Sequence, residues 1–287
     1  MQSSICTTSK MLNLRSLDPL IELAFAEDIG IGDITTESTV SASQKGIGTL
    51  FAKSEGIVAG LPVVDRVFAK LDTTLRFRAL VNDGDAITIG MSIAEIQGSA
   101  KTILIGERTA LNFLQRLSGV ATLTSQFVKA AADYDVKIVD TRKTTPGWRA
   151  LQKYAVRVGG GHNHRFGLYD GILIKDNHIV AAEGIRNAVQ SARKAAPHTT
   201  KIEVEVETIE QVNEALDVGV DILLLDNMSL DMMQQVVQLV GTRAVTEASG
   251  GITLEQVQAV AATGVDLISV GALTHSAMPL DISLKLT

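Results

Sequence analysis

The chain of 287 residues is 46% hydrophobic and carries a net charge of −6, which suits a globular protein of one large or two modest domains. This acidity argues against nucleic acid as a partner, and no apolar run approaches the ~20 residues of a membrane span, so we expect neither partner. The single cysteine, Cys6, excludes an intramolecular disulfide and a cysteine-built metal site, and it favours the reducing conditions of the cytoplasm.

The first seventeen residues, "MQSSICTTSKMLNLRSL", contain no acidic residue, two basic residues and many Ser and Thr. Organellar transit peptides share this composition, and so do ordinary termini outside a folded domain. We interpret residues 1–12 as a flexible N-terminus, and the sequence leaves open whether they form a targeting segment.

Short runs of alternating hydrophobicity occupy residues 45–105, among them "TLRFRALV" and "DAITIGMSIAEI". The turn "NDGD" at residues 82–85 lies between two such runs and is typical of a β-hairpin. These features predict an N-terminal α+β domain over residues 13–115 with an antiparallel sheet. A biotinyl or lipoyl domain has a similar pattern, but this turn lacks the lysine that would carry the cofactor.

A different pattern begins near residue 100, where Leu111, Leu114 and Leu117 recur at helical spacing. Strand-like runs then alternate with helical ones, two of which end at Gly219 and Gly264. The strand-like runs are "VKIVD", "DGILIK", "IEVEVE", "DILLLD", "AVTEAS" and "DLISVG". Parallel strands joined by helices form either a doubly wound sheet or a TIM-like α/β barrel.

Polar and glycine-containing sequences follow these strands and distinguish the two folds. They are "DTRK", "KDNH", "DN", "SGG" and "GALTHS". In a barrel they would all meet at the carboxyl ends of the strands, where barrel active sites lie. A doubly wound sheet would bring only the loops near its switch point to a ligand. We therefore predict a six-stranded barrel domain over residues 116–275.

The run "IEVEVE" at residues 202–207 alternates between aliphatic residues and glutamate, so the two faces of this strand differ in polarity. In a barrel the glutamate face lines the lumen, where buried carboxylates need cations or a metal as partners. The alternative is an edge strand with its charged face in water.

Positive charge gathers in one part of this acidic chain: residues 108–178 contain eleven Lys and Arg against five Asp. Arg142, Lys143, Arg165 and Lys175 lie at or near the ends of adjacent predicted strands, together with His164. Each alone is most simply a solvated surface charge. Their convergence on one rim predicts an anion site, because guanidinium groups match carboxylate geometry.

Acidic and glycine residues complete the predicted rim. Glu205 and Asp226 end neighbouring strands and suit Mg²⁺, although ion pairs with Lys175 and Lys143 would also account for them. Glycines at residues 250, 251 and 271 allow backbone N–H groups to approach a phosphate, although glycine pairs are also found in plain turns. A zinc site at "HNH" is disfavoured, because no cysteine and no third histidine lies close in sequence to His162 and His164.

The motifs "DTRKTTPG", "GGGHNHRFGLYDGILIKDNH", "EVEVET", "LLLDN" and "SGGI" occur in this order in the quinolinate phosphoribosyltransferase family, which the chain resembles from about residue 13 to its end. "EDIGIGDITT" and "GERTALNFLQRLSG" are similar to that family as well. The resemblance implies a Mg²⁺-dependent pentosyltransferase of NAD biosynthesis. It would convert quinolinate and phosphoribosyl pyrophosphate to nicotinate mononucleotide, pyrophosphate and carbon dioxide.

The resemblance also implies an architecture and an assembly. An N-terminal α/β sandwich domain would precede an incomplete barrel, and residues 276–287 would pack back on the N-terminal domain. The chain would form a homodimer, with a hexamer as a further possibility, and Arg108 would enter the partner's active site. Quinolinate and phosphoribosyl pyrophosphate would be the small-molecule partners.

Carried onto this sequence, the resemblance assigns roles to the rim residues. The catalytic residues would be Lys143, Lys175, Glu205 and Asp226, the last two also holding the metal. The substrate-binding residues would be Arg108, Thr141, Arg142, Lys143, His164, Arg165, Lys175, Glu205, Asp226, Ser249, Gly250, Gly251, Gly271 and His275.

Three other functions remain open. A related molybdenum-associated branch tends to lose parts of "RKTTPG" and "IKDNH", which are intact here. Direct use of nicotinate would need fewer cations than the arginine-rich rim provides. A non-catalytic anion-binding barrel would be expected to have lost charged rim residues.

Overall fold

The computed structural model describes residues 12–287, so the interpretation of residues 1–12 lies, apart from Leu12, outside the described residues. The chain divides into two compact units. Of the described residues, the first unit contains 12–125, 145–160 and 277–287. The second contains residues 126–144 and 161–276.

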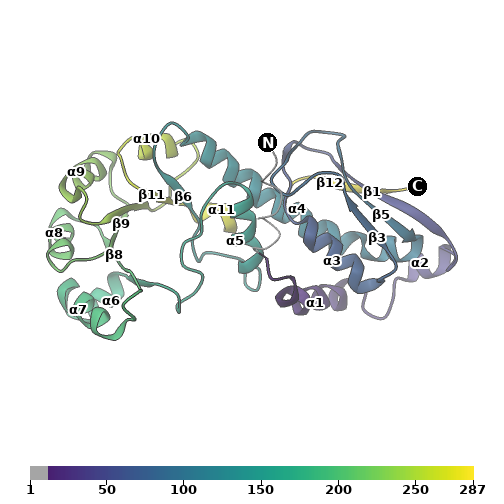
Figure 1. Ribbon diagram of the computed structural model, residues 1–287, viewed down its shortest axis with the longest axis horizontal. Coiled ribbons are helices and arrows are strands. Elements are labelled where there is room, and N and C mark those ends of the chain that lie inside the picture. Colours follow the sequence, from purple (N-terminus) through teal and green to yellow (C-terminus); the bar gives the residue numbers. More distant parts are fainter. Residues whose placement is uncertain (1–11) are drawn as a thin grey trace. The chain divides into compact units, whose positions relative to one another are not determined.

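The first unit is built on an antiparallel sheet of four strands in the order β12-β1-β5-β3, which confirms the predicted sheet (Figure 1). Its elements are η2 (Leu14–Leu17), α1 (Asp18–Asp28), α2 (Ile34–Thr39), β1 (Lys45–Ala52), β2 (Gly56–Ile57), α3 (Leu61–Leu71), β3 (Arg76–Ala79), β4 (Ala86–Ile87), β5 (Ser92–Ser99), most of α4 (Ala100–Ala130), α5 (Arg149–Val158) and β12 (Ile282–Leu286). Strand β12 pairs with β1 near the other end of the chain, with Lys285 opposite Thr49.

The sequence "NDGD" does not form the predicted hairpin. Strand β3 pairs with β5, whereas β4 pairs with β2 in a separate two-stranded sheet. The turn instead serves the start of α3, because Asp83 accepts hydrogen bonds from the N–H groups of Gly60 at 2.7 Å and Leu61 at 3.0 Å. Helix N-termini leave such N–H groups without partners inside the helix, so a turn aspartate next to one is stabilised there.

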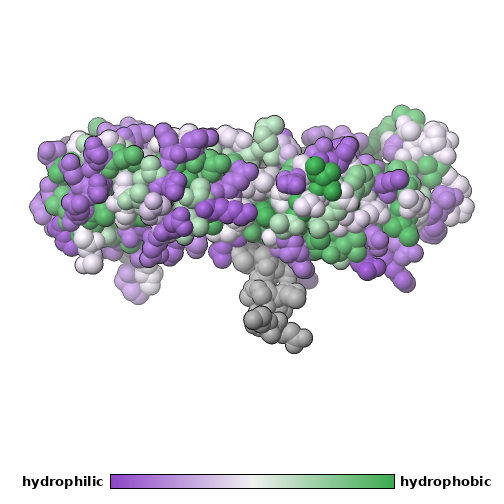
Figure 2. Space-filling view, turned by 90° about the horizontal axis from the view of Figure 1, so that it is seen from above, coloured by the Kyte–Doolittle hydropathy of each residue, from purple (hydrophilic) through white to green (hydrophobic). Residues whose placement is uncertain are grey.

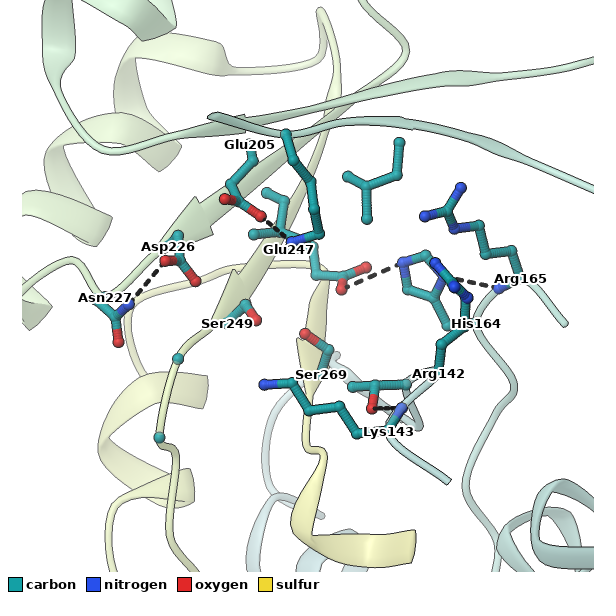
Figure 3. A pocket seen from close by; sticks show the side chains of 16 residues that line it. Arg142, Lys143, His164, Arg165, Glu205, Asp226, Asn227, Glu247, Ser249 and Ser269 are labelled. Atoms are coloured by element: carbon teal, nitrogen blue, oxygen red, sulfur yellow. Dashed lines mark hydrogen bonds and ion pairs between the residues drawn. The ribbon is translucent and has the colours of Figure 1, made fainter. Parts of the chain in front are cut away.

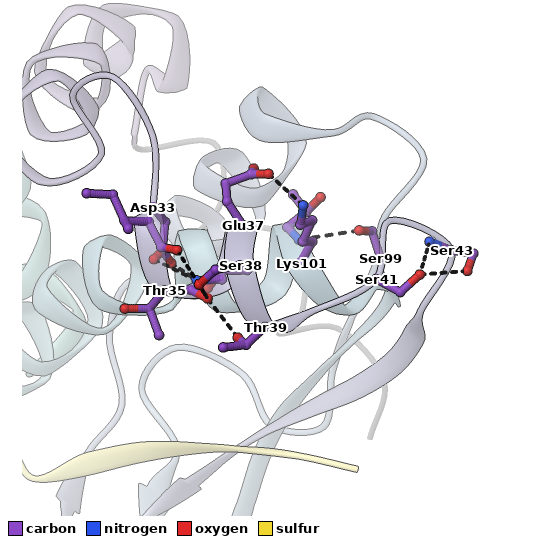
Figure 4. Close-up of polar contacts among 12 residues, drawn as sticks. Asp33, Thr35, Glu37, Ser38, Thr39, Ser41, Ser43, Ser99 and Lys101 are labelled. Atoms are coloured by element: carbon purple, nitrogen blue, oxygen red, sulfur yellow. Dashed lines mark hydrogen bonds and ion pairs between the residues drawn. The ribbon is translucent and has the colours of Figure 1, made fainter.

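Helix α2 is held by its own polar residues and by an ion pair to α4 (Figure 4). Asp33 caps the helix by accepting the N–H of Thr36 at 3.0 Å. Lys101, in the first turn of α4, donates to Glu37 at 2.6 Å. An exposed pair of this kind stabilises by less than about 1 kcal/mol, so the cap is the stronger local constraint.

The second unit is a parallel sheet of six strands in the order β6-β11-β10-β9-β8-β7. Its elements are β6 (Lys137–Val139), β7 (Ile172–Ile174), α6 (Asp176–Ala181), α7 (Ile185–Ala195), β8 (Ile202–Val206), α8 (Ile209–Asp217), β9 (Ile222–Asp226), α9 (Leu230–Val240), β10 (Val245–Ser249), α10 (Val257–Ala261), β11 (Leu267–Ser269) and α11 (Ala272–His275).

This strand order is that of an incomplete barrel. From β7 to β11 each strand pairs with the next in sequence, and β11 then pairs with β6. A doubly wound sheet would instead reverse direction at a switch point. Strand β8 lies between β7 and β9, so the edge-strand alternative for "IEVEVE" is wrong and the lumen interpretation is confirmed. Val204 and Val206 are fully buried on one face of β8. Glu203 and Glu205 therefore lie on the opposite face, which lines the interior of the barrel.

The division into units differs from the predicted domain boundaries. The boundary between residues 115 and 116 falls inside α4, a single helix of 31 residues in which Leu114 and Leu117 are both buried. Residues 145–160, predicted as part of the barrel, group with the first unit. One reason is that Tyr154 of α5 donates a hydrogen bond to Asp83 at 2.5 Å, a contact 71 residues apart in sequence.

The surface shown in Figure 2 carries hydrophilic residues throughout, with smaller hydrophobic patches between them. Among the described residues, no helix combines the length and the hydrophobicity needed to cross a membrane.

Candidate active site

A cavity of about 560 Å³ opens at the carboxyl ends of the parallel strands in the second unit (Figure 3). Its wall is formed by side chains of the five strands β7 to β11 and of segments that follow β6, α5, β7, β9 and β10. The lining residues are Thr141, Arg142, Lys143, His164, Arg165, Leu173, Lys175, Glu205, Leu224, Asp226, Asn227, Glu247, Ser249, Gly250, Gly251 and Ser269. The sheet therefore brings together residues that are up to 128 positions apart, counted from Thr141 to Ser269.

Most of the predicted site residues line this cavity, and three do not. Arg108 is exposed on α4 in the first unit. Gly271 and His275 lie next to Lys143, since a Cβ atom on Gly271 would be 3.1 Å from both Lys143 Cδ and His275 Nε2. His162, which the sequence assigned no role, is exposed and lines a second cavity instead.

The segment after β6 is a tight turn that presents Arg142 and Lys143. Lys143 N–H donates to Thr141 Oγ1 at 3.0 Å, and the Thr274 hydroxyl donates to the Lys143 carbonyl at 2.8 Å. These two bonds hold the N–H and the carbonyl of Lys143. The side chains of Arg142 and Lys143 therefore project from a backbone whose position is fixed.

A second segment carries His164 and Arg165, and the buried Asp140 at the end of β6 anchors it. Asp140 accepts hydrogen bonds from His164 N–H at 2.9 Å and from Asn163 Nδ2 at 2.6 Å. Burial, followed by repulsion from Arg142, lowers the pKa of Arg165. The guanidinium groups of Arg142 and Arg165 repel each other, and an anion bound between them would stabilise both. This part of the cavity therefore fits a carboxylate or phosphate.

The acidic side of the cavity comes from β8 and β9. Glu205 forms an ion pair with Lys175, and Asp226 accepts a hydrogen bond from Asn227 Nδ2 at 2.7 Å. The predicted ion pair between Glu205 and Lys175 is therefore present. Glu205 and Asp226 belong to paired strands and both face the cavity, and two carboxylates are the hard oxygen ligands that Mg²⁺ prefers.

The glycines after β10 adopt backbone conformations that favour glycine, with φ of +104° at Gly250 and +61° at Gly251. A Cβ atom on Gly250 would lie 2.2 Å from Asn227 Oδ1, so no side chain fits there. Asn227 N–H donates to the Ser249 carbonyl at 3.0 Å, which joins the ends of β9 and β10. Gly250 and Gly251 both line the cavity, so the backbone there can be approached closely by a phosphate, as in phosphate-binding glycine loops.

Sequence reasoning missed Asn227, Glu247 and Ser269 in the cavity wall. Glu247 is two residues before Ser249 on β10, so strand periodicity could have placed both on the same face. Asn227 belongs to the rim sequence "DN" but was assigned no role; it has φ of +52°, a conformation that asparagine adopts more readily than most other residues. Burial and repulsion from Glu203 raise the pKa of Glu247 to about 7.

A second cavity, of about 650 Å³, lies toward the amino ends of the same strands and is lined by Lys137, Ile172 and Leu267. His164, Arg165 and Glu247 line both cavities. These three side chains therefore lie between the two spaces.

Comparison with known proteins decides the family. Residues 120–285 match the family model "Quinolinate phosphoribosyl transferase, C-terminal domain", and residues 33–118 match the corresponding N-terminal domain. The chain belongs to the quinolinate phosphoribosyltransferase family. The resemblance found in the sequence is thereby confirmed.

Relatives of this family match over nearly the whole chain. The "Probable nicotinate-nucleotide pyrophosphorylase [carboxylating]" of Bacillus subtilis is 49% identical and covers 96% of this chain and 95% of its own length. A tobacco protein, "Quinolinate phosphoribosyltransferase [decarboxylating] 2b, mitochondrial", is 42% identical over 94% of this chain and 82% of its own. The crystal structure of NadC from Streptococcus pyogenes is 42% identical, with a TM-score of 0.92 and 99% coverage of both chains.

Proposed function

We propose that this chain transfers a phosphoribosyl group to quinolinate and releases pyrophosphate and carbon dioxide, in NAD biosynthesis. The observation that carries the proposal is one cavity in which four cationic residues face three acidic residues and a glycine loop. These charges complement a pyridine dicarboxylate and a sugar that carries phosphates. Membership of the quinolinate phosphoribosyltransferase family supports the same reaction.

Quinolinate would bind at the cationic wall. Arg142 and Arg165 would each face a carboxylate, because guanidinium groups form two parallel hydrogen bonds to such a group. His164 and Thr141 complete this side of the cavity. An arginine pair is more than a monocarboxylate needs, so this wall favours quinolinate over nicotinate.

Phosphoribosyl pyrophosphate would bind across the opposite wall. Its 5′-phosphate would lie at Ser249, Gly250 and Gly251, with Gly271 and His275 nearby, and its pyrophosphate would face Lys143 and Lys175. Glu205 and Asp226 would contact the ribose hydroxyls and hold Mg²⁺. When bound, Mg²⁺ neutralises negative charge on the pyrophosphate.

The reaction needs no protein nucleophile. The bond between the ribose anomeric carbon and a pyrophosphate oxygen breaks as the quinolinate nitrogen bonds to that carbon, and pyrophosphate leaves with the electron pair. Lys143 and Lys175 stabilise the charge on pyrophosphate, and Glu205 or Asp226 stabilises positive character on the ribose. The C2 carboxylate then leaves as carbon dioxide. Its bonding electrons stay on C2, next to the cationic nitrogen, and C2 then takes up a proton.

An assay of product formation tests this function. With Mg²⁺, quinolinate and phosphoribosyl pyrophosphate, purified protein is expected to form nicotinate mononucleotide and to release carbon dioxide in equal amount. Chelating the metal with EDTA should abolish turnover, and added Mg²⁺ should restore it. Nicotinate in place of quinolinate serves as the matched substrate, and equal or faster turnover of nicotinate would overturn the substrate assignment.

We further propose a homodimer in which Arg108 of one chain enters the cavity of the other, and a cytoplasmic location. Arg108 is exposed and does not line the cavity in the second unit of the same chain. An exposed cation in this position supports a role across an interface. The location rests on the single cysteine.

Mixing two inactive variants tests the shared site. Arg108→Ala and Lys175→Ala chains are each expected to be inactive, because each lacks one cation of every cavity. After mixing and reassociation, one cavity of each mixed dimer contains both residues, so activity should return to about a quarter of the wild-type level. Native mass spectrometry would verify the mixed dimers, and their presence without activity would contradict the proposal.

A further inference from the structure

Two buried acids inside the barrel have no role in the proposed reaction. Glu203 of β8 and Glu247 of β10 are only 5% and 2% exposed, and the Oε1 atom of each has no hydrogen-bond partner among the described residues. Both face the same ring nitrogen, because His164 Nε2 is 3.1 Å from Glu203 Oε2 and 3.7 Å from Glu247 Oε1. Figure 3 shows the Glu247 carboxylate directed at the His164 ring.

The other ring nitrogen determines where the proton of His164 resides. The backbone N–H of Arg165 donates to His164 Nδ1 at 2.7 Å. A backbone N–H can only donate, so Nδ1 must carry its lone pair, and a neutral imidazole then has its proton on Nε2. That proton points toward Glu203 and Glu247, so the donors and acceptors around the ring agree on one tautomer.

A metal ion is the competing explanation for this cluster, because His164, Glu203 and Glu247 have ligand atoms within 4.8 Å of one another. A metal bound to Nε2 would move the ring proton to Nδ1. There it would face the N–H of Arg165 at 2.7 Å, with two donors opposed. The hydrogen-bonded arrangement therefore fits the surroundings of the ring better than a cation does.

His164 is the link between these acids and the substrate-facing Arg165. Its ring receives the Arg165 N–H, and the Arg165 guanidinium in turn donates to the Gly171 carbonyl at 3.0 Å. Rotation of the imidazole would remove the acceptor from the Arg165 backbone. The acceptor oxygen of Glu203 holds the ring against that rotation.

We propose that Glu203, assisted by Glu247, is a positioning residue: it holds His164 in the Nε2–H tautomer and so fixes Arg165 for carboxylate binding. This inference rests on the proposed function, in which Arg165 binds quinolinate. The role requires an acceptor oxygen and not a negative charge. Two unscreened charges so close together in a buried space are costly, and the raised pKa of Glu247 agrees with a carboxyl that keeps its proton near neutral pH.

Paired substitutions at Glu203 separate an acceptor from a charge. Glu203→Gln keeps the acceptor oxygen, so the KM for quinolinate should stay within about threefold of wild type. Glu203→Met has similar length but no strong acceptor, so that KM should rise about 10-fold to 100-fold. The KM for phosphoribosyl pyrophosphate should change less than about twofold in both variants, which reports an intact opposite wall. Glu247→Gln, which mimics a protonated carboxyl, should resemble Glu203→Gln.

The tautomer itself is measurable without turnover. The chain has 5 histidines, and the imidazole ¹⁵N signals of His164 are identified by their loss in His164→Asn. Wild-type protein should show a protonated Nε2 and an unprotonated Nδ1, and Glu203→Met should lose this fixed pattern. A proton on Nδ1 in the wild type would overturn the inference.

The kinetic results can also overturn it. Equal impairment of Glu203→Gln and Glu203→Met would show that charge, or a bound cation, is what matters. An unchanged quinolinate KM in Glu203→Met would show that Glu203 positions nothing. If wild-type protein does not use quinolinate at all, the proposed function fails, whereas the ¹⁵N measurement still decides the tautomer.

Discussion

Replacing Lys175 with methionine is expected to lower kcat by about 10²-fold to 10³-fold, the loss typical of one preorganised charge at a developing anion. Lys175 is the N-cap residue of α6 at the rim, and its ammonium group forms an ion pair with Glu205. The substitution removes a positive charge from the proposed pyrophosphate site. It also leaves Glu205 without its cation, which disturbs the carboxylate that would contact the ribose and Mg²⁺.

Steady-state kinetics of pyrophosphate release would measure this effect, with thermal unfolding as a check on the fold. Lys194→Met is the matched control, because Lys194 is an exposed lysine in the last turn of α7 and does not line the cavity. It should retain activity within about twofold, as surface substitutions usually do. A decrease of less than tenfold in Lys175→Met would contradict the assignment of Lys175 to the leaving group.

Gly250→Ala is expected to weaken binding of phosphoribosyl pyrophosphate by about 10-fold to 100-fold, because a displaced loop loses a hydrogen bond to a charged phosphate, which contributes about 1.5–3 kcal/mol. The new Cβ would lie 2.2 Å from Asn227 Oδ1 and 2.9 Å from Asn227 N, and the latter atom belongs to the backbone. The ends of β9 and β10 would have to separate. The φ of +104° adds strain of about 1–3 kcal/mol for any residue with a side chain.

Isothermal titration with phosphoribosyl pyrophosphate and Mg²⁺ would measure this loss of affinity. Gly219→Ala is the matched control, since Gly219 has φ of +70° after α8 and no atom within 4 Å of its would-be Cβ. It introduces left-handed backbone strain without a steric clash, so stability should fall by about 1 kcal/mol with the ligand affinity unchanged. Equal affinity of Gly250→Ala and wild type would remove the glycine loop from the phosphate site.

Sequence periodicity predicted the strands of the second unit closely. "VKIVD" contains β6 and "DILLLD" contains β9. The polar residues on either side of a short apolar run show where the strand begins and ends. The hairpin at residues 82–85 failed for the opposite reason. A turn signal reports only that the chain bends, and the pairing of β3 with β5 and of β4 with β2 depends on distant strands.

The same distinction applies to the site. Arg142, Lys143, Arg165 and Lys175 were predicted because each follows a strand, and the carboxyl ends of parallel strands meet at one rim. Glu247 does not follow a strand, and only its two-residue spacing from Ser249 places it on the cavity face. Glu203 and Glu247 are 44 residues apart, and only the curvature of the sheet brings both to His164.

The sequence by itself determined the kind of fold, the family and the charges of the rim, because hydrophobic period, strand-end chemistry and long ordered motifs are local properties. Tertiary structure alone decided that α5 belongs with the first unit and that β8 is an interior strand. It also decided that His164 faces two buried carboxylates. These features depend on contacts between residues far apart in the chain, and no local pattern encodes which of them will meet.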